Sequence, residues 1–450
     1  MNRNLFTTLT IITLVAGTSY NSAAQPAGVD HLLLLQMQET IRQQQQQLQQ
    51  QTEQIRAQSE ILQKLQQQLN ALQQASPSPQ TVPVVLQTPL PPPVPAVTSG
   101  NDRIKLAISG QINRAVLVAN DGYNSTLYHV DNTVSNSRIR FVGTANATND
   151  LTVGTRLEIA VSPDRSSAVS QQQKYLTDTY FDQRWVELSL TSKTFGKLSI
   201  GKGDTASNTT AEVDLSRTDV VQYASITDMG GGFLFRSKNG TMPFIPNGTS
   251  NLKVSDAFSS LDGLSRQSRL RYDSPVLYGF RLAGSLVSNQ RSDLALFWGG
   301  EGYGFKGAGA FAVSNTKGSA TYTTRPDATL LYDGSFSLLH TVTGLNLTLS
   351  GALQQHTTRK DATNLYAKLG WLASLTSLGN TAFGVDYTRS EHMAQAGDKG
   401  YSVGAAVVQA FDKIATELYL QYRVFSLDRA AGTTPVADIN IGTFGARVKF

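Results

Sequence analysis

From residue 101 to the C-terminus, apolar and polar side chains alternate in a long series of short runs. In the run at 344–356, for example, Leu345, Leu347 and Leu349 are each separated by one polar residue. A period of two gives a β-strand one face for lipid or a core and one face for water. These runs are about ten residues long, which is the length that a tilted strand needs to cross a bilayer.

Sixteen runs of this kind follow one another. They are 104–119, 136–148, 150–162, 180–192, 195–203, 266–275, 279–288, 291–299, 303–315, 327–338, 344–356, 361–373, 379–391, 398–410, 414–427 and 437–450. Short joins alternate with long polar ones, as the two rims of a membrane barrel require, and the count is even. The sequence predicts an all-β domain over 101–450, a 16-stranded antiparallel transmembrane β-barrel, preceded by an α-helical coiled-coil segment.

The alternative all-β architecture is a soluble β-sandwich. Its strands average five to six residues, which is about half the length of these runs, and its outer face is polar. Aromatic residues also gather near the run ends, as an interfacial girdle requires. They are Tyr272, Tyr278, Trp298, Trp371, Tyr387 and Phe450. A mean hydropathy of −0.20 suits a barrel with one polar face, so the barrel is favoured.

Residues 1–24 have the layout of a secretory signal peptide. Arg3 lies in a short basic head, an apolar run extends from Leu5 to Gly17, and Ser22 and Ala24 stand at the −3 and −1 positions of a cleavage site. The apolar run is too short to span a bilayer as a helix. The sequence therefore predicts export, with a mature chain that starts at Gln25.

Residues 30–75 are glutamine-rich and carry one apolar side chain every seven residues. These are Leu34, Ile41, Leu48, Ile55, Leu62 and Leu69. A heptad position kept apolar over six repeats predicts a coiled-coil oligomerisation segment, and hence a homo-oligomer. The alternative is a disordered glutamine-rich tail. Residues 76–100 follow as a Pro-rich spacer, because their proline density excludes helix and sheet interiors.

Several segments of residues 104–450 resemble the general trimeric porins of Gram-negative outer membranes. They are SGQINR at 109–114, SRIRFVG at 137–143, FGKLSIGK at 195–202, and RYDSP at 271–275 with GF at 279–280. The terminal Phe450, with apolar residues alternating before it, resembles the signal that the barrel-assembly machinery reads.

The resemblance implies a homotrimer in outer-membrane lipid that passes small hydrophilic solutes or ions. The coiled coil is similar to that of a porin subgroup with a periplasmic trimeric stalk. That likeness implies that the porin passes organic anions such as dicarboxylates, as some members of the subgroup do. A helix over the heptad residues would be ~65 Å long at ~1.5 Å per residue, which is enough to approach the peptidoglycan.

A segment at about 204–265 shows little alternation. A structureless stretch of this length inside a compact domain is usually functional. The resemblance implies a constriction loop that folds into the lumen, whereas the alternative is a solvated surface loop. Its early acidic residues are Asp204, Glu212, Asp214, Asp219 and Asp228.

Charged residues within the runs are predicted to line the pore. If Ile139 and Phe141 face lipid, then Arg138 and Arg140 face inward, and the same parity applies to the other runs. Charges inside the hydrocarbon band are tolerated only toward water. The predicted pore-lining set is Arg138, Arg140, Arg156, Glu158, Arg269, Arg271 and Arg281. Six arginines against one glutamate predict mild anion preference, although some of these arginines could instead pair with neighbours near the rims.

Signals for an enzyme are poor. The chain has no cysteine, which excludes thiol nucleophiles and Cys-ligated metals, and its five histidines lack ligand spacing. The GxGxxG match at 302–307 lies between two predicted strands without a following helix, so it lacks the phosphate-binding context. We expect a non-enzymatic porin with no cofactor, no metal and no nucleic-acid partner. The alternatives are an envelope tether that acts through the stalk, and an outer-membrane barrel hydrolase.

Overall fold

The computed structural model describes residues 97–101, 103–176, 181–244, 250–317 and 327–450, together with six single helical positions between Glu39 and Glu60. The predicted signal peptide, the heptad positions of the coiled coil and nearly all of the spacer lie outside these residues and stay predictions. The chain divides into two units, Met1–Thr81 and Val82–Phe450, and the second unit contains the sheet. Among the described residues, no helix has the length and apolar character needed to cross a membrane.

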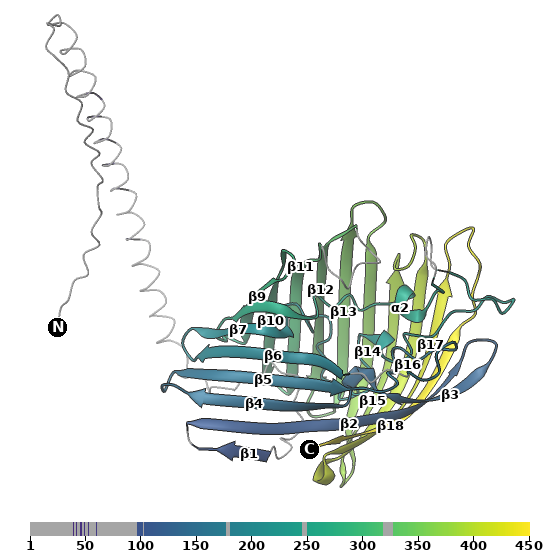
Figure 1. Cartoon of the computed structure of the whole chain (residues 1–450), viewed down its shortest axis with the longest axis horizontal. Helices are drawn as coiled ribbons and strands as arrows, with labels where there is room; N and C mark the ends of the chain where they lie inside the picture. The colour runs from purple at the N-terminus through teal and green to yellow at the C-terminus, as the bar shows by residue number, and fades with distance from the viewer. Residues whose placement is uncertain are drawn as a thin grey trace, which may run out of the picture. The chain divides into compact units, whose positions relative to one another are not determined.

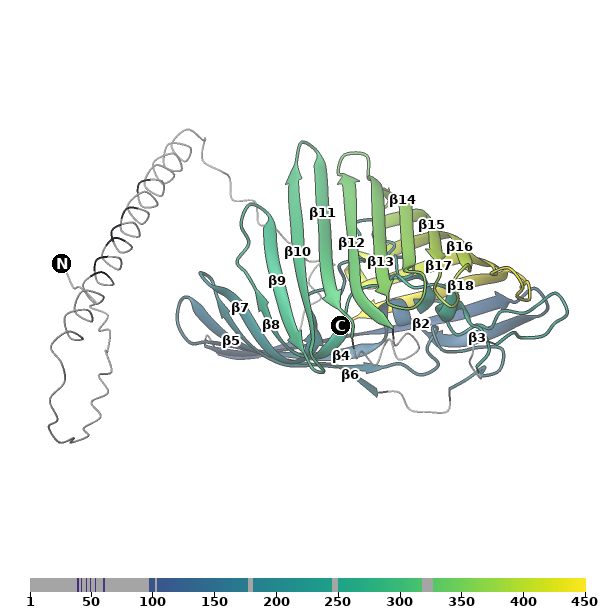
Figure 2. The ribbon, with the colours of Figure 1, turned by 90° about the horizontal axis from the view of Figure 1, so that it is seen from above.

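Sixteen antiparallel strands close into one ring, which confirms the predicted fold of this part of the chain (Figure 1, Figure 2). They are β2 (Ile104–Asn120), β4 (Arg138–Asn146), β5 (Leu151–Val161), β6 (Phe181–Ser192), β7 (Gly196–Asp204), β8 (Arg266–Asp273), β9 (Phe280–Val287), β10 (Arg291–Gly302), β11 (Phe305–Asn315), β12 (Ala328–His340), β13 (Leu345–His356), β14 (Ala362–Thr376), β15 (Gly379–Glu391), β16 (Lys399–Phe411), β17 (Thr416–Asp428) and β18 (Ile439–Lys449). Each overlaps one predicted run. Pairing of β18 with β2, from Asn440 opposite Asn120 to Lys449 opposite Gln111, closes the ring.

Two further strands, β1 (Val97–Gly100) and β3 (Ser125–Asp131), pair with β2 and were not predicted. β3 and β4 pair with successive halves of one edge of β2, and β1 pairs with its other edge near the start of the strand. An excursion at 132–137, with the 3-10 turn η1 (Thr133–Ser135), separates β3 from β4. Alternation conceals β3 because Leu127 faces outward while Tyr128 and Val130 are buried inward, so both faces carry apolar side chains.

The outer face of the barrel is apolar and the inner face carries small and polar residues. On β10, Leu294 and Leu296 are 54% and 43% exposed, whereas the alternate residues Ala295 and Phe297 are buried. An apolar exterior of this extent is stable against hydrocarbon rather than water. Alternation in the sequence thus separates a lipid-facing surface from a lumen.

Described residues of the segment between β7 and β8 pack against the inner wall of the barrel. This segment contains the 3-10 turn η2 (Ile226–Asp228) and the short helix α2 (Val254–Ala257). Phe233, Phe235 and Phe258 from this loop are fully buried in the main hydrophobic cluster, together with wall residues such as Phe425. Burying three aromatic side chains contributes on the order of 1.5–3 kcal/mol each, so packing fixes the loop against the wall.

Candidate functional site

A cavity of about 740 Å³ lies between the lumen wall and the loop. Arg138 and Arg184 on the wall and Arg266 at the start of β8 lie on one side of its lining. The loop contributes Glu212, Asp228 and Asp262. Basic and acidic side chains from separate elements therefore line the same cavity.

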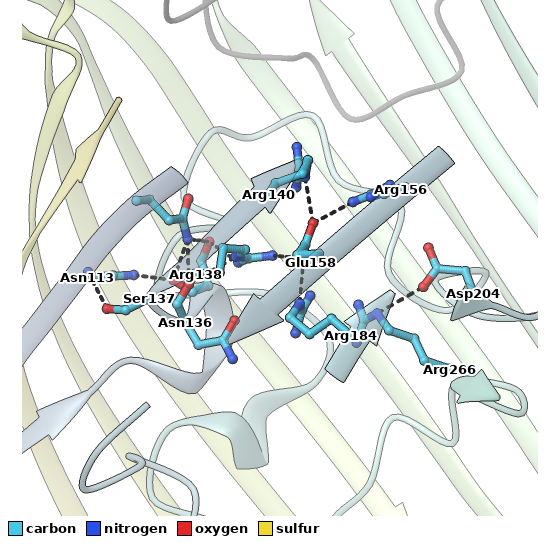
Figure 3. Close-up of polar contacts among 12 residues, drawn as sticks. Asn113, Asn136, Ser137, Arg138, Arg140, Arg156, Glu158, Arg184, Asp204 and Arg266 are labelled. Carbon is cyan, nitrogen blue, oxygen red and sulfur yellow. Dashed lines mark hydrogen bonds and ion pairs between the residues drawn. The ribbon is translucent and has the colours of Figure 1, made fainter. Parts of the chain in front are cut away.

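The basic wall is organised around a single carboxylate (Figure 3). Glu158 on β5 is completely buried and binds four guanidinium groups. The nitrogen-to-oxygen distances are 3.5 Å for Arg138, 2.6 Å for Arg140, 2.7 Å for Arg156 and 2.7 Å for Arg184. Because guanidinium groups stay protonated in proteins, four positive charges and one negative charge leave a net charge of +3 at this cluster.

Pairing between β4 and β5 assembles most of this cluster. Arg140 lies directly opposite Glu158, and Arg138 lies opposite Ala160 on the same face. Arg156 precedes Glu158 by two residues, so strand alternation points both side chains into the lumen. The parity of the sequence predicts this inward placement for all four residues.

Arg184 joins the cluster through a β-bulge. In the pairing of β5 with β6, Glu158 lies opposite Trp185 and Ile159 lies opposite Gln183, so Arg184 is an extra residue. A bulge of this kind directs two consecutive side chains to one face. Arg184 and Trp185 therefore both face the lumen, although strict alternation would place Arg184 on the outside.

Arg266 extends the basic surface toward the loop. Its Nε lies 3.0 Å from an Asp204 carboxylate oxygen, and its guanidinium carbon lies 4.7 Å from the centroid of the Trp185 ring. Asp204 is the last residue of β7 and Arg266 the first of β8, so this ion pair joins the two ends of the loop.

The loop acids have raised pKa values. Burial raises the pKa of Asp262 to about 6, although backbone N–H groups of Thr209 and Ala211 donate to its carboxylate at 2.7 Å and 2.9 Å. Burial, then the neighbouring Asp262 and Asp228 carboxylates, hold the pKa of Glu212 well above its usual range. Burial also raises the pKa of Asp228, which accepts a hydrogen bond from the Tyr223 hydroxyl. The acidic side therefore loses charge at a higher pH than ordinary carboxylates do.

Buried polar contacts fasten the loop to the far wall. Lys368 on β14 forms an ion pair with Asp214 and donates to the carbonyl oxygen of Gln222 at 2.9 Å. Ser207 donates to Asp293 on β10 at 2.5 Å. Since Asp214 is buried in this contact, it anchors the loop and does not line the cavity.

The remaining predicted arginines lie on β8 and β9 of the wall. Arg269 forms an ion pair with Glu187, while Arg271 and Arg281 both bind Asp273. None of the three lines the cavity that the structure describes. They face inward as the parity predicts, but each is paired with an acid: Arg269 reaches across β7 to Glu187 on β6, Arg281 binds Asp273 on the neighbouring β8, and Arg271 binds Asp273 on its own strand.

The last two predicted positions lie elsewhere. Asp219 on the loop is half-buried, and burial, then the Asp214 carboxylate, raise its pKa. The backbone of Phe450 pairs with Gly110 of β2, with N–O distances of 2.7 Å and 3.0 Å. A Cβ at Gly110 would lie 2.5 Å from the Phe450 ring, so glycine is needed for this close approach.

Sequence reasoning missed Arg184, Trp185, Arg266, Asp262 and Lys368. Lys368 lies in the predicted run 361–373, on the face opposite Leu365 and Leu369, so parity could have found it. The bulge in β6 hides Arg184 and Trp185. The places of Arg266 and Asp262 depend on how the loop folds. The GxGxxG match forms the hairpin turn between β10 and β11, with Tyr303 and Gly304 at its tip.

The comparisons with known proteins agree with this geometry. The family model described as Gram-negative porin matches residues 94–430, which is more than half of the chain. The chain belongs to the Gram-negative porin family. No curated protein matches the chain.

Three solved structures show the same fold. An anion-selective porin from Comamonas acidovorans is 13% identical, with a TM-score of 0.52 over 77% of this chain and 100% of that one. Outer-membrane protein OmpT of Vibrio cholerae, folded in vitro, is 13% identical, with a TM-score of 0.51 over 79% and 100%. OmpF of Salmonella typhi in complex with daunomycin has the same four values as OmpT. At this identity the likeness concerns the fold alone.

Family and fold together identify the chain as an outer-membrane β-barrel channel. The lumen is the conducting path of such a barrel.

Proposed function

We propose that this porin forms a water-filled pore for passive diffusion of small hydrophilic solutes, with mild anion preference and no enzymatic activity. The observation that carries the proposal is the Glu158 cluster, where four guanidinium groups share one carboxylate beside the cavity. Fixed positive charge at a water-filled constriction attracts anions and repels cations.

Protonation of the loop acids supports a mild preference. The cavity is lined by five arginines and by five acids, so its formal charges balance. The arginines are Arg138, Arg165, Arg184, Arg266 and Arg359, and the acids are Asp182, Glu212, Asp228, Asp256 and Asp262. Because the pKa values of Glu212, Asp228 and Asp262 are raised, these acids are protonated, and lose their negative charge, at a higher pH than ordinary carboxylates. The net charge of the cavity lining is then positive, which favours anions.

Planar-bilayer recording tests this proposal. The purified porin should give stable conductance. In a KCl gradient, the sign of its reversal potential should show that chloride permeates more readily than potassium. Steady cation preference would refute the selectivity, and a folded protein without conductance would refute the channel.

We also propose that residues 30–75 form a periplasmic coiled-coil stalk that supports a homotrimer near the peptidoglycan. The heptad pattern supports this proposal. Deleting residues 30–75 should leave single-channel conductance intact and weaken the trimer during heating in detergent. A deletion variant with wild-type trimer stability would argue against the stalk. Phe450, at the closure of the barrel, is proposed as the residue that the assembly machinery reads.

A further inference from the structure

Trp185 occupies an unusual place for an aromatic residue in a membrane barrel. The other two tryptophans, Trp298 and Trp371, stack on Phe336 and Phe383 near the ends of their strands. Trp185 instead faces the lumen through the bulge in β6 and is only 6% exposed. Its five-membered ring lies over Gly203, where a Cβ would approach it to 2.7 Å. Because Gly203 has no side chain, the wall has room for an indole at this point.

Three guanidinium groups lie over this indole, and those of Arg156 and Arg266 approach it more closely than that of Arg184, which lies 5.6 Å from the ring centroid. The guanidinium carbon of Arg156 is 3.6 Å from the ring centroid, and that of Arg266 is 4.7 Å from it. A ring of this kind attracts a cation to its π-electrons, and tryptophan does so most strongly. The indole therefore offers a common partner to two like charges that repel each other.

Ion pairs alone do not fix these two arginines. Arg156 shares the Glu158 carboxylate with three other guanidinium groups. Arg266 pairs with Asp204 through Nε, which leaves its two Nη groups beside the cavity that the loop acids also line. Without the ring, Arg266 would be free to turn toward the Asp262 carboxylate, which would offset its charge.

We propose that Trp185 is a specificity-determining positioning residue that holds Arg156 and Arg266 on the basic wall through cation–π contacts. The inference rests on the proposed diffusion function, since it concerns the selectivity of the same constriction. It assigns the selectivity to the π-electrons of one side chain as well as to fixed charge.

Substitution gives a first test. Trp185→Leu keeps an apolar but smaller side chain without π-electrons, whereas Trp185→Phe keeps a smaller ring. We expect the chloride-to-potassium permeability ratio to fall about twofold or more in Trp185→Leu and by less in Trp185→Phe. Trp298→Leu, which removes an indole from the outer face, is the matched control and should keep the wild-type ratio. An unchanged ratio in Trp185→Leu, or equal losses in both variants, would overturn the proposal.

A second test keeps the shape of the ring. In a Trp298→Phe/Trp371→Phe background, Trp185 is the only tryptophan of the chain, so fluorinated tryptophan can be incorporated at that position alone. Fluorine withdraws electrons from the ring face, so the permeability ratio should fall stepwise with each added fluorine. A flat series would overturn the proposal even if Trp185→Leu fails to fold. Absence of conductance in the wild-type protein would instead refute the proposed function.

Discussion

Replacing Asp262 by asparagine should remove most of the pH dependence of ion selectivity. The pKa of Asp262 is about 6 because burial disfavours its charged form. The carboxyl is therefore mostly neutral at pH 5 and mostly ionised at pH 7.5, where the added negative charge opposes anion entry. Asp204 and Arg266 face the same carboxyl, and so does Glu212, whose own pKa burial holds well above its usual range.

The size of the effect follows from Coulomb's law. A unit charge about 5 Å from a passing ion contributes about 0.8 kcal/mol in water. Screening at about 0.1 M salt reduces this to about 0.5 kcal/mol. The contribution has opposite signs for chloride and potassium, so their permeability ratio should fall about threefold to fivefold between pH 5 and pH 7.5 in the wild type.

Reversal potentials across a KCl gradient at a series of pH values provide the assay. Asp262→Asn should show less than half of the wild-type change, with a ratio at pH 7.5 close to the wild-type ratio at pH 5. Glu301→Gln, at the turn end of β10 and outside the cavity lining, should follow the wild-type curve. A pH curve for Asp262→Asn that superimposes on the wild-type curve would refute the reasoning.

Three other substitutions test separate parts of the account. Glu158→Gln leaves four guanidinium groups without their shared carboxylate, so it should destabilise the barrel by about 3 kcal/mol in thermal unfolding. It should also strengthen the anion preference measured by reversal potentials. Unchanged stability would show that Glu158 does not hold these arginines together. Lys368→Met leaves Asp214 buried without a partner, at a cost of about 3–5 kcal/mol, and the freed loop should alter single-channel conductance and increase its noise. Gly110→Ala forces a Cβ into the Phe450 ring and should lower the yield of folded barrel, whereas Gly442→Ala, with open space at its Cβ, should not.

Alternation in the sequence was sufficient to predict the wall of the barrel. A one-residue shift would move every charge of a strand to the lipid face, so the register is strongly specified. For the same reason, the inward placement of Arg138, Arg140, Arg156 and Glu158 could be predicted from their neighbours alone. Which of the inward arginines would line the cavity could not be predicted, because Arg269 and Arg281 bind acids on other strands and Arg271 shares Asp273 with Arg281, and the sequence does not display these contacts.

The features that the sequence concealed have local physical causes. The bulge at Arg184 breaks the parity of β6 at one residue, so simple alternation assigns that side chain to the wrong face. The loop has no period, because its apolar residues pack on the inner wall individually instead of forming a strand or a long helix. Asp262 therefore gives no sign in the sequence that it returns to the cavity beside Glu212.

The most direct test of the central claim is single-channel recording of the wild-type porin in a KCl gradient at pH 6. The pore should open in stable conductance steps, grouped in threes for the proposed trimer, and its reversal potential should show chloride preference. A folded barrel that stays closed, or one that passes potassium in preference to chloride, would contradict it.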